Sequence, residues 1–193
     1  MANLFAKLGL EAFRAGITPR TKESREWFSK RVADMSVNRN TLMRDDSLKR
    51  TEAEIVGSMN MFFYDPKTKD TLPYYDRFPL VVIVGQAKDG FYGLNLHYLP
   101  MNLRAMLLDA LLDNLTNEKY DTSTRFRLTY NLLQSTARLR YFKPCFKHYL
   151  SSNVKGNFAR VPSTEWEIAT FLPTARWTKA SQRQVYTDSR RMI

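Results

Sequence analysis

The sequence predicts an α+β protein in which a small antiparallel SH3-like β-barrel is flanked by an N-terminal helix and a helical C-terminal half. Segments rich in aromatic and β-branched residues lie between about residues 55 and 100. Segments with apolar residues at helical spacing lie on both sides of them. The composition, 44% apolar and 25% charged, is that of a folded chain. We expect one globular unit made of residues 1–54, 55–100 and 101–193.

The N-terminal segment is predicted to be helical. A short helix at residues 3–13 is expected to end near Gly16. Thr18-Pro19 supplies a hydroxyl cap and a first-turn proline for a second helix, which Phe28 and Val32 would pack onto the rest of the protein. Residues 37–54 are polar and predict an irregular connector. The polar side of the second helix is basic and carries Arg25, Lys30 and Arg31.

The middle segment is predicted to hold at least three antiparallel strands. GSMNMFFYD, FPLVVIVG and GFYGLNLHYL have the residue types of strands. Asp89-Gly90 predicts a tight hairpin between the second and third of them. The first and second are joined by a longer connection that contains Asp65-Pro66 and Leu72-Pro73. Short strands joined by one long and one tight turn favour a small curled sheet or barrel.

The C-terminal half is predicted to be helical. Apolar residues recur at helical spacing in residues 101–115 and 123–139. Pro144 is taken as the start of a helix through CFKHYLSS. Thr164 with Glu167 predicts a capping box ahead of WEIATFL. The last sixteen residues, TKASQRQVYTDSRRMI, predict a basic helix or tail.

Charge is the strongest global signal, with 30 basic against 19 acidic residues and a net charge of +11. The excess lies in residues 1–50 and 138–193, whereas residues 51–137 are slightly acidic overall. A near-neutral middle with basic ends indicates an anionic partner, of which nucleic acid is the commonest. An acidic protein or a membrane surface would produce the same bias. The longest apolar runs are too short to cross a membrane, and a secretory signal is not evident, so we expect an intracellular protein.

Residues that could carry chemistry are few. Asp65, Asp70 and Asp76 could converge on a metal ion as in a nuclease, but aspartates also initiate turns, and we favour the turn interpretation. His97 and His148 lack a carboxylate or cysteine at metal spacing and are expected to be packed or on the surface. A glycine-rich phosphate loop is absent, and Cys145 is the single cysteine, so the sequence predicts no cofactor and no thiolate zinc site.

Cations interleaved with aromatic rings are the better candidates for a binding site. ARLRYFKPCFKHYL alternates the two, which suits a surface that grips phosphates and stacks bases, and equally a packed segment with a solvated basic side. Tyr74 and Tyr75, beside Arg77, could stack bases or anchor their loop. The predicted phosphate contacts are Arg138, Arg140, Lys143, Lys147, Lys155 and Arg160, with Arg25, Lys30 and Arg31 as a second patch.

Several strings resemble a known family. YDPKTKDTLPYYDRFPLVV, then GFYGLNLHYLP and an LR-x-x-LLDAL helix, then FKPCFKHYLSS, EWEIATFLP and QVYTDSR, are similar to virion proteins of T-even-like contractile-tailed bacteriophages. Within that set they resemble the DNA end protector family. The match covers most of the chain from about Trp27 onward, and its motifs carry no known catalytic residue.

The resemblance implies a non-enzymatic protein of the virion that binds the double-stranded ends of the packaged linear genome and shields them from host exonuclease. It implies a place near the head portal or neck, with portal, neck or tail proteins as further partners and no membrane. The protein would be found in the host cytoplasm during assembly. A structural neck, tail or baseplate subunit that makes only protein contacts is the alternative. A metal-dependent nuclease that uses the three aspartates is the third.

Overall fold

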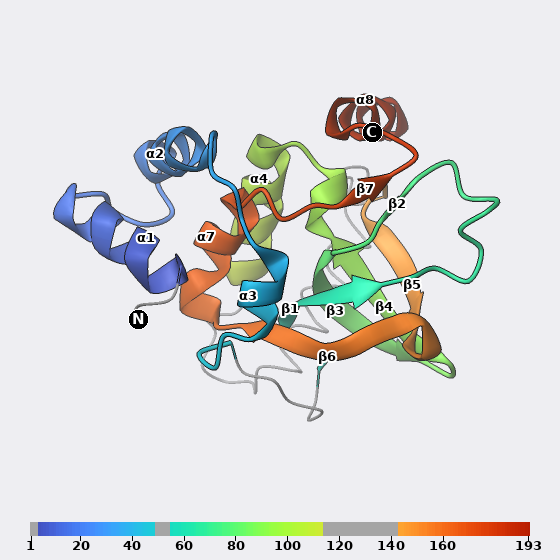
Figure 1. Ribbon diagram of the computed structural model, residues 1–193. Helices are drawn as coiled ribbons and strands as arrows, with labels where there is room; N and C mark the ends of the chain where they lie inside the picture. Colours follow the sequence, from blue (N-terminus) through green and yellow to red (C-terminus); the bar gives the residue numbers. More distant parts are fainter. Residues whose placement is uncertain (1–3, 49–54, 114–142) are drawn as a thin grey trace.

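A five-stranded antiparallel sheet occupies the middle of the molecule in the computed structural model, which describes residues 4–48, 55–113 and 143–193 (Figure 1). The strand order is β5-β4-β3-β1-β6. The five strands are β1 (Met59–Tyr64), β3 (Leu80–Ala87), β4 (Gly90–Asn95), β5 (Phe146–Leu150) and β6 (Val154–Val161). A separate pair joins β2 (Tyr75–Asp76) to β7 (Trp177–Thr178). The α+β class is therefore as predicted.

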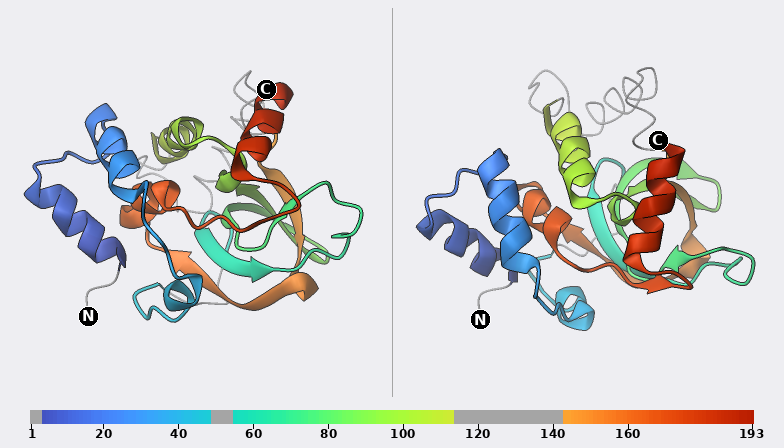
Figure 2. Two further views of the ribbon diagram at one scale, coloured as in Figure 1. Left: turned by 45° about the horizontal axis from the view of Figure 1, so that its top comes forward. Right: turned by 90° about the horizontal axis from the view of Figure 1, so that it is seen from above.

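The sheet is curled but open. β5 and β6 are its opposite edges, yet only the single turn η2 (Ser151–Asn153) separates them in the chain, so the two edges must approach each other at that corner. Figure 2 shows the strands following a curved path. Among the described strands no ladder joins β5 to β6. The predicted closed SH3-like barrel is therefore not found.

The prediction of a helical C-terminal half is wrong for residues 146–161, which supply both edge strands. Pro144 precedes a strand rather than a helix. In β5 the side chains of Phe146 and His148 are exposed whereas Tyr149 is buried, and pairing with β4 satisfies the backbone. Partners distant in sequence override the local helical signal here.

The concave side of the sheet is filled with aromatic rings. The Phe62 ring of β1 lies 5.7 Å from Phe91 in β4, 5.3 Å from Tyr149 in β5 and 4.9 Å from Phe158 in β6, measured between ring centroids. Strands that are not neighbours in the sheet meet in this cluster, which is possible only on the inside of the curl. Edge-to-face pairs of this kind contribute about 0.5–1.5 kcal/mol each beyond the area that they bury.

Helices cover the convex side of the sheet. Met59, Met61 and Leu80 face this side and join a larger core with the helices. α7 is the central helix, because it contacts α1, α2 and α4. The six α-helices of the described residues are α1 (Leu4–Arg14), α2 (Lys22–Val32), α3 (Arg39–Met43), α4 (Met101–Asp113), α7 (Trp166–Phe171) and α8 (Gln182–Met192).

Two predicted helix starts are corrected. α2 is capped by Thr21 rather than Thr18: the Thr21 hydroxyl accepts from the Ser24 amide and the Ser24 hydroxyl accepts from the Thr21 amide, each at 3.0 Å. α7 follows a 3-10 turn, η3 (Ser163–Glu165), and has no capping box, because the Glu167 carboxylate accepts from the Ser24 hydroxyl at 2.6 Å instead. Glu167 thereby ties the first turn of α7 to that of α2.

Other expectations have mixed outcomes. α1 ends at Arg14, near Gly16 as predicted, and Gly16 has a φ of 70° with the Ile17 amide donating to the Ala12 carbonyl across it. The predicted connector contains the short helix α3. The tight β3–β4 hairpin is confirmed by pairing of Ala87 with Gly90. The predicted helix at 123–139 lies outside the described residues. No described helix has the length and apolar character needed to cross a membrane.

Candidate nucleic-acid interface

The basic patch predicted on α2 is largely used within the protein. Arg25 forms an ion pair with Asp109 of α4, and Arg31 Nε donates to Glu11 of α1 at 2.7 Å. Lys30 is exposed and makes no ion pair with the described residues. Two of the three cations therefore hold neighbouring helices together.

The basic residues around β5 and β6 differ from those of α2. Lys143 and Lys155 are exposed, and Lys147 and Arg160 are partly buried. None of these four forms an ion pair with a carboxylate in the described part of the chain, although the structure holds such pairs elsewhere. Arg138 and Arg140 lie outside the described residues. The β5–β6 segment thus presents cations that no carboxylate of the described residues neutralises.

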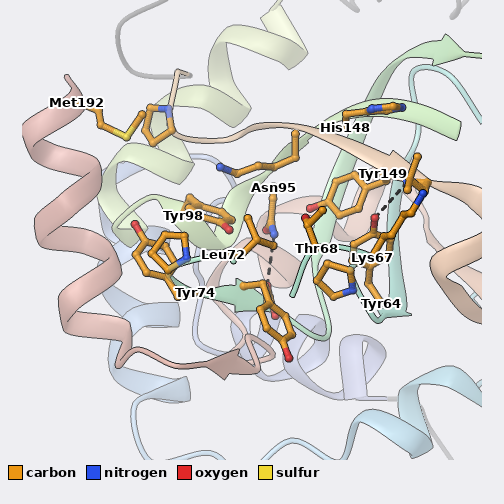
Figure 3. Close-up of a pocket in the computed structure, with 17 residues that line it drawn as sticks. Tyr64, Lys67, Thr68, Leu72, Tyr74, Asn95, Tyr98, His148, Tyr149 and Met192 are labelled. Atoms are coloured by element: carbon orange, nitrogen blue, oxygen red, sulfur yellow. Dashed lines mark hydrogen bonds between the residues drawn. The ribbon is translucent and has the colours of Figure 1, made fainter. Parts of the chain in front are cut away.

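A pocket of about 480 Å³ lies between this segment and the β1–β3 connection. One wall is formed by residues 66–68 and 72–75, the other by residues 147–150 of β5, and Met192 of α8 closes one end. In Figure 3, Tyr74 and Tyr98 lie toward α8, Tyr64, Tyr149 and Lys67 lie at the opposite end, and Asn95 lies between them. We call this space the tyrosine pocket.

The tyrosine pocket has an aromatic wall. Tyr74, Tyr98 and Trp177 pack together, with the Tyr98 and Trp177 ring centroids 4.8 Å apart and the planes perpendicular. Burial raises the pKa of Tyr74 and of Tyr98, so both phenols stay neutral at physiological pH. Tyr75 is partly exposed, and no ring of the described residues packs on it. Its ring is available for contact with a ligand.

Lys147 brings a positive charge into the tyrosine pocket. Its Nζ lies 4.0 Å from the centroid of the Tyr98 ring, which is cation–π geometry. Burial lowers the pKa of Lys147, because leaving water disfavours the ammonium. No carboxylate of the described residues is paired with it. A partly desolvated cation that lacks a counter-ion favours the approach of an anion.

A buried hydrogen-bond chain holds the floor of the pocket. His97 Nδ1 lies 2.6 Å from Asp76 Oδ2, and His97 Nε2 lies 3.0 Å from Thr174 Oγ1. Burial lowers the pKa of His97, so the ring is neutral and donates to Asp76. Burial opposes ionisation of Asp76, but His97 and the amides of Arg176 and Phe78 lower the pKa of its carboxyl overall.

The hydrogen-bonded series Asp76–His97–Thr174 has the same order of carboxylate, imidazole and hydroxyl as a hydrolase triad, but its hydroxyl is not accessible to a substrate. His97 and Thr174 are 0% exposed and Asp76 is 4% exposed, so the Thr174 hydroxyl cannot meet a substrate. These hydrogen bonds instead fix the backbone next to Tyr75, which precedes Asp76, and Tyr98, which follows His97. Both tyrosines line the pocket. His97 is a packed histidine, as predicted.

Each of the three aspartates considered for a metal site has a different environment. Asp65 pairs with Lys69 at 3.1 Å, Asp70 is exposed, and Asp76 is buried against His97. Across residues 4–48, 55–113 and 143–193, no group of three or more potential metal ligands occurs. His148 is on β5, not on a helix as predicted, and its Nε2 lies 3.1 Å from Asp89 Oδ1.

The sequence predicts some of the residues that line the tyrosine pocket. Tyr74 and Tyr75 were predicted as possible stacking residues and Lys147 as a phosphate contact, and the fold brings all three to one space. Tyr98 and Asn95 were missed, because the sequence does not show that β4 and the turn after it lie beside β5, where Lys147 packs over the Tyr98 ring. The residue types in FKHYL do not alternate between apolar and polar, and Phe146 is exposed whereas Tyr149 is buried, so no local signal marks this strand.

Comparison with known proteins identifies a family. The family model described as "Phage T4 terminal DNA protecting protein" matches residues 7–192. No curated protein and no solved structure matches the chain.

Proposed function

The chain belongs to the phage T4 terminal DNA protecting protein family, and from this membership we propose that it binds the ends of packaged linear DNA in a phage virion and shields them from exonuclease. The observation that points to particular residues is the set of cations on the β5–β6 segment that form no ion pair with the described residues. The predicted DNA contacts are Lys143, Lys147, Lys155 and Arg160, with Lys30 from α2.

The charge pattern supports binding to a phosphate backbone. Cations gain most from phosphates when no carboxylate of the protein already neutralises them, because each such contact releases counter-ions from the DNA. Lys143 lies just before β5 and Lys155 lies near the start of β6, and both are exposed. A site near the portal or neck, where a genome end would be held, is part of the same proposal.

Exonuclease protection tests the proposal directly. Linear duplexes of several lengths are titrated with the protein and digested with a duplex exonuclease. If the protein protects ends, the amount of protein that protects half of the DNA is proportional to the number of DNA ends and does not depend on the length of the duplex. Covalently closed circles should compete weakly at equal mass. Protection that scales with base pairs, together with equal competition by circles, would overturn the proposal.

A second candidate is a structural subunit of the neck, tail or baseplate. It is favoured by exposed apolar side chains on α1, where Phe13 is 80% and Leu10 48% exposed, because such side chains suit a protein partner. The position in the particle separates the two candidates. A stoichiometric amount in tails purified without heads supports the subunit, whereas presence in filled heads and absence from tails supports end protection.

A nuclease remains the third candidate for experiment. Supercoiled plasmid incubated with magnesium and the protein reports nicking. An activity that Asp70→Asn or Asp65→Asn abolishes would favour this candidate over protection.

A further inference from the structure

We propose that the tyrosine pocket binds a single unpaired nucleotide at the end of a DNA strand, with its phosphate at Lys147 and its base against the ring of Tyr75. This inference rests on the proposed function and adds to it a means of telling an end from the interior of a duplex. Duplex interiors offer phosphates but no unpaired base.

The size of the pocket matches one nucleotide. Its volume of about 480 Å³ lies within the range of small-molecule sites. An intact duplex is far too large for it, since the major groove of a duplex can itself admit an α-helix. The occupant must therefore be one residue of a single strand, either an overhang or a nucleotide unpaired from a frayed end.

The charge of the pocket selects an anion. Lys147 and Lys67 line it, and the one acidic side chain among its described lining residues is Asp76. Both carboxylate oxygens of Asp76 are already engaged: Oδ1 accepts from the Phe78 and Arg176 amides and Oδ2 faces the His97 ring. Lys147 therefore has no counter-ion among the described residues of the pocket, and a phosphate would supply one.

The rings of the pocket select a base. Tyr75 is partly exposed and carries no ring partner among the described residues, while its neighbour Asp76 is fixed by the buried chain. A ring held in place loses little freedom when a base stacks on it. Every base has an apolar face, so such a site accepts any terminal sequence.

The pocket also opens next to the other cations. Lys143 is exposed and adjoins Pro144, a residue of the pocket wall. A strand whose last nucleotide enters the pocket would therefore meet a further cation as it leaves. The pocket and the β5–β6 cations would act on the same DNA strand.

The test uses the full chain and hairpin-closed duplexes that have one open end. The open end is either blunt or carries a short single-stranded overhang, with 2-aminopurine as the terminal base or at an internal position. Stacking on a tyrosine should quench the terminal fluorophore and leave the internal one unchanged. Lys147→Met is expected to weaken binding of the overhang duplex about tenfold, the loss of one charge-assisted contact.

Matched variants separate the pocket from general charge. Lys143→Met removes a neighbouring lysine that does not line the pocket, and it should lower affinity for overhang and blunt ends equally. Tyr75→Leu should abolish the terminal quenching. Thermal melts of Lys147→Met and Lys143→Met beside the parent protein show whether weaker binding reflects unfolding.

Three results would overturn the inference. One is that the parent protein binds overhang and blunt ends with equal affinity and that Lys147→Met lowers both affinities as Lys143→Met does. Another is terminal quenching that persists in Tyr75→Leu. The third is displacement of the overhang duplex by a free deoxynucleoside monophosphate at equal concentration, which would mark a mononucleotide site instead. In each case exonuclease protection in the parent protein still reports independently on end protection, so the two proposals can fail separately.

Discussion

His97 is a fully buried imidazole whose protonation state bears on stability. Burial lowers its pKa in the folded protein, so below the unfolded-state pKa of about 6.5 the unfolded chain binds more protons than the folded one. Stability therefore falls as the pH is lowered through that value. The lowered pKa of Asp76 acts in the same direction but at more acidic pH, below its unfolded value of about 3.9.

We predict that the free energy of unfolding decreases between pH 7.5 and 5.5 and that His97→Asn flattens this dependence while lowering stability at pH 7.5. Urea denaturation at three pH values measures both effects. His148→Asn is the control, because His148 is exposed and the chain has two histidines. A slope that disappears in the His148 variant instead would show that the buried ring is not its source.

Arg104 is a buried guanidinium that is satisfied by uncharged partners. Its Nε donates to the Leu99 carbonyl at 2.7 Å, Nη1 to the Thr170 carbonyl at 3.1 Å and Nη2 to the Tyr186 hydroxyl at 2.7 Å. It thereby connects α4 with α7, α8 and the segment that carries Tyr98. Burial lowers its pKa, since leaving water disfavours the cation.

Arg104→Met is predicted to destabilise the protein by about 3 kcal/mol, because two buried carbonyls and a hydroxyl lose their donor. Arg190→Met, at an exposed arginine of α8, should change stability by less than about 0.5 kcal/mol. Chemical denaturation of the two variants is the measurement. Equal effects would contradict the role given to Arg104.

At the scale of elements, the sheet depends on close approach of β3 and β4. A Cβ at Gly93 would lie 2.2 Å from Val81 Cγ1, in the packed interior. Gly93→Ala is therefore predicted to cost about 1–3 kcal/mol by overpacking. Gly85→Ala, on the facing strand with open space around its Cβ, should be neutral or slightly stabilising. Thermal melts of the two variants test this prediction. A Gly93→Ala variant as stable as the parent would contradict the packing argument.

Elements were predictable where the signal is local. β1, β3, the β3–β4 hairpin and α2 follow from residue types and turn residues within each segment. β5 and β6 were not predictable in this way, because their cations and rings suit a helix and a strand almost equally. These segments form strands because their backbones pair with strands distant in the sequence: β5 pairs with β4, and β6 pairs with β1.

At the scale of the whole molecule, the net charge is +11, and the described cations fall into two groups: those in ion pairs, such as Arg31, and those without an ion pair among the described residues, such as Lys155. We predict that Lys155→Gln lowers the slope of log affinity against log salt by about 1, as expected for one lost phosphate contact. Arg31→Gln should leave that slope unchanged, because its partner is Glu11. DNA binding measured at several salt concentrations tests this, and equal slope changes would restore the α2 patch as a DNA contact.

The sequence by itself determined the α+β class, the tight hairpin, the basic ends and the resemblance that the family match confirms. All of these depend on residue types and on spacing within short segments. Only the tertiary structure decided that the sheet is open, that Arg25 and Arg31 are paired within the protein, and that Tyr75 faces the same pocket as Lys147. The physical reason is that strand pairing, ion pairs and pockets are made by residues far apart in the chain, whose meeting no local pattern encodes.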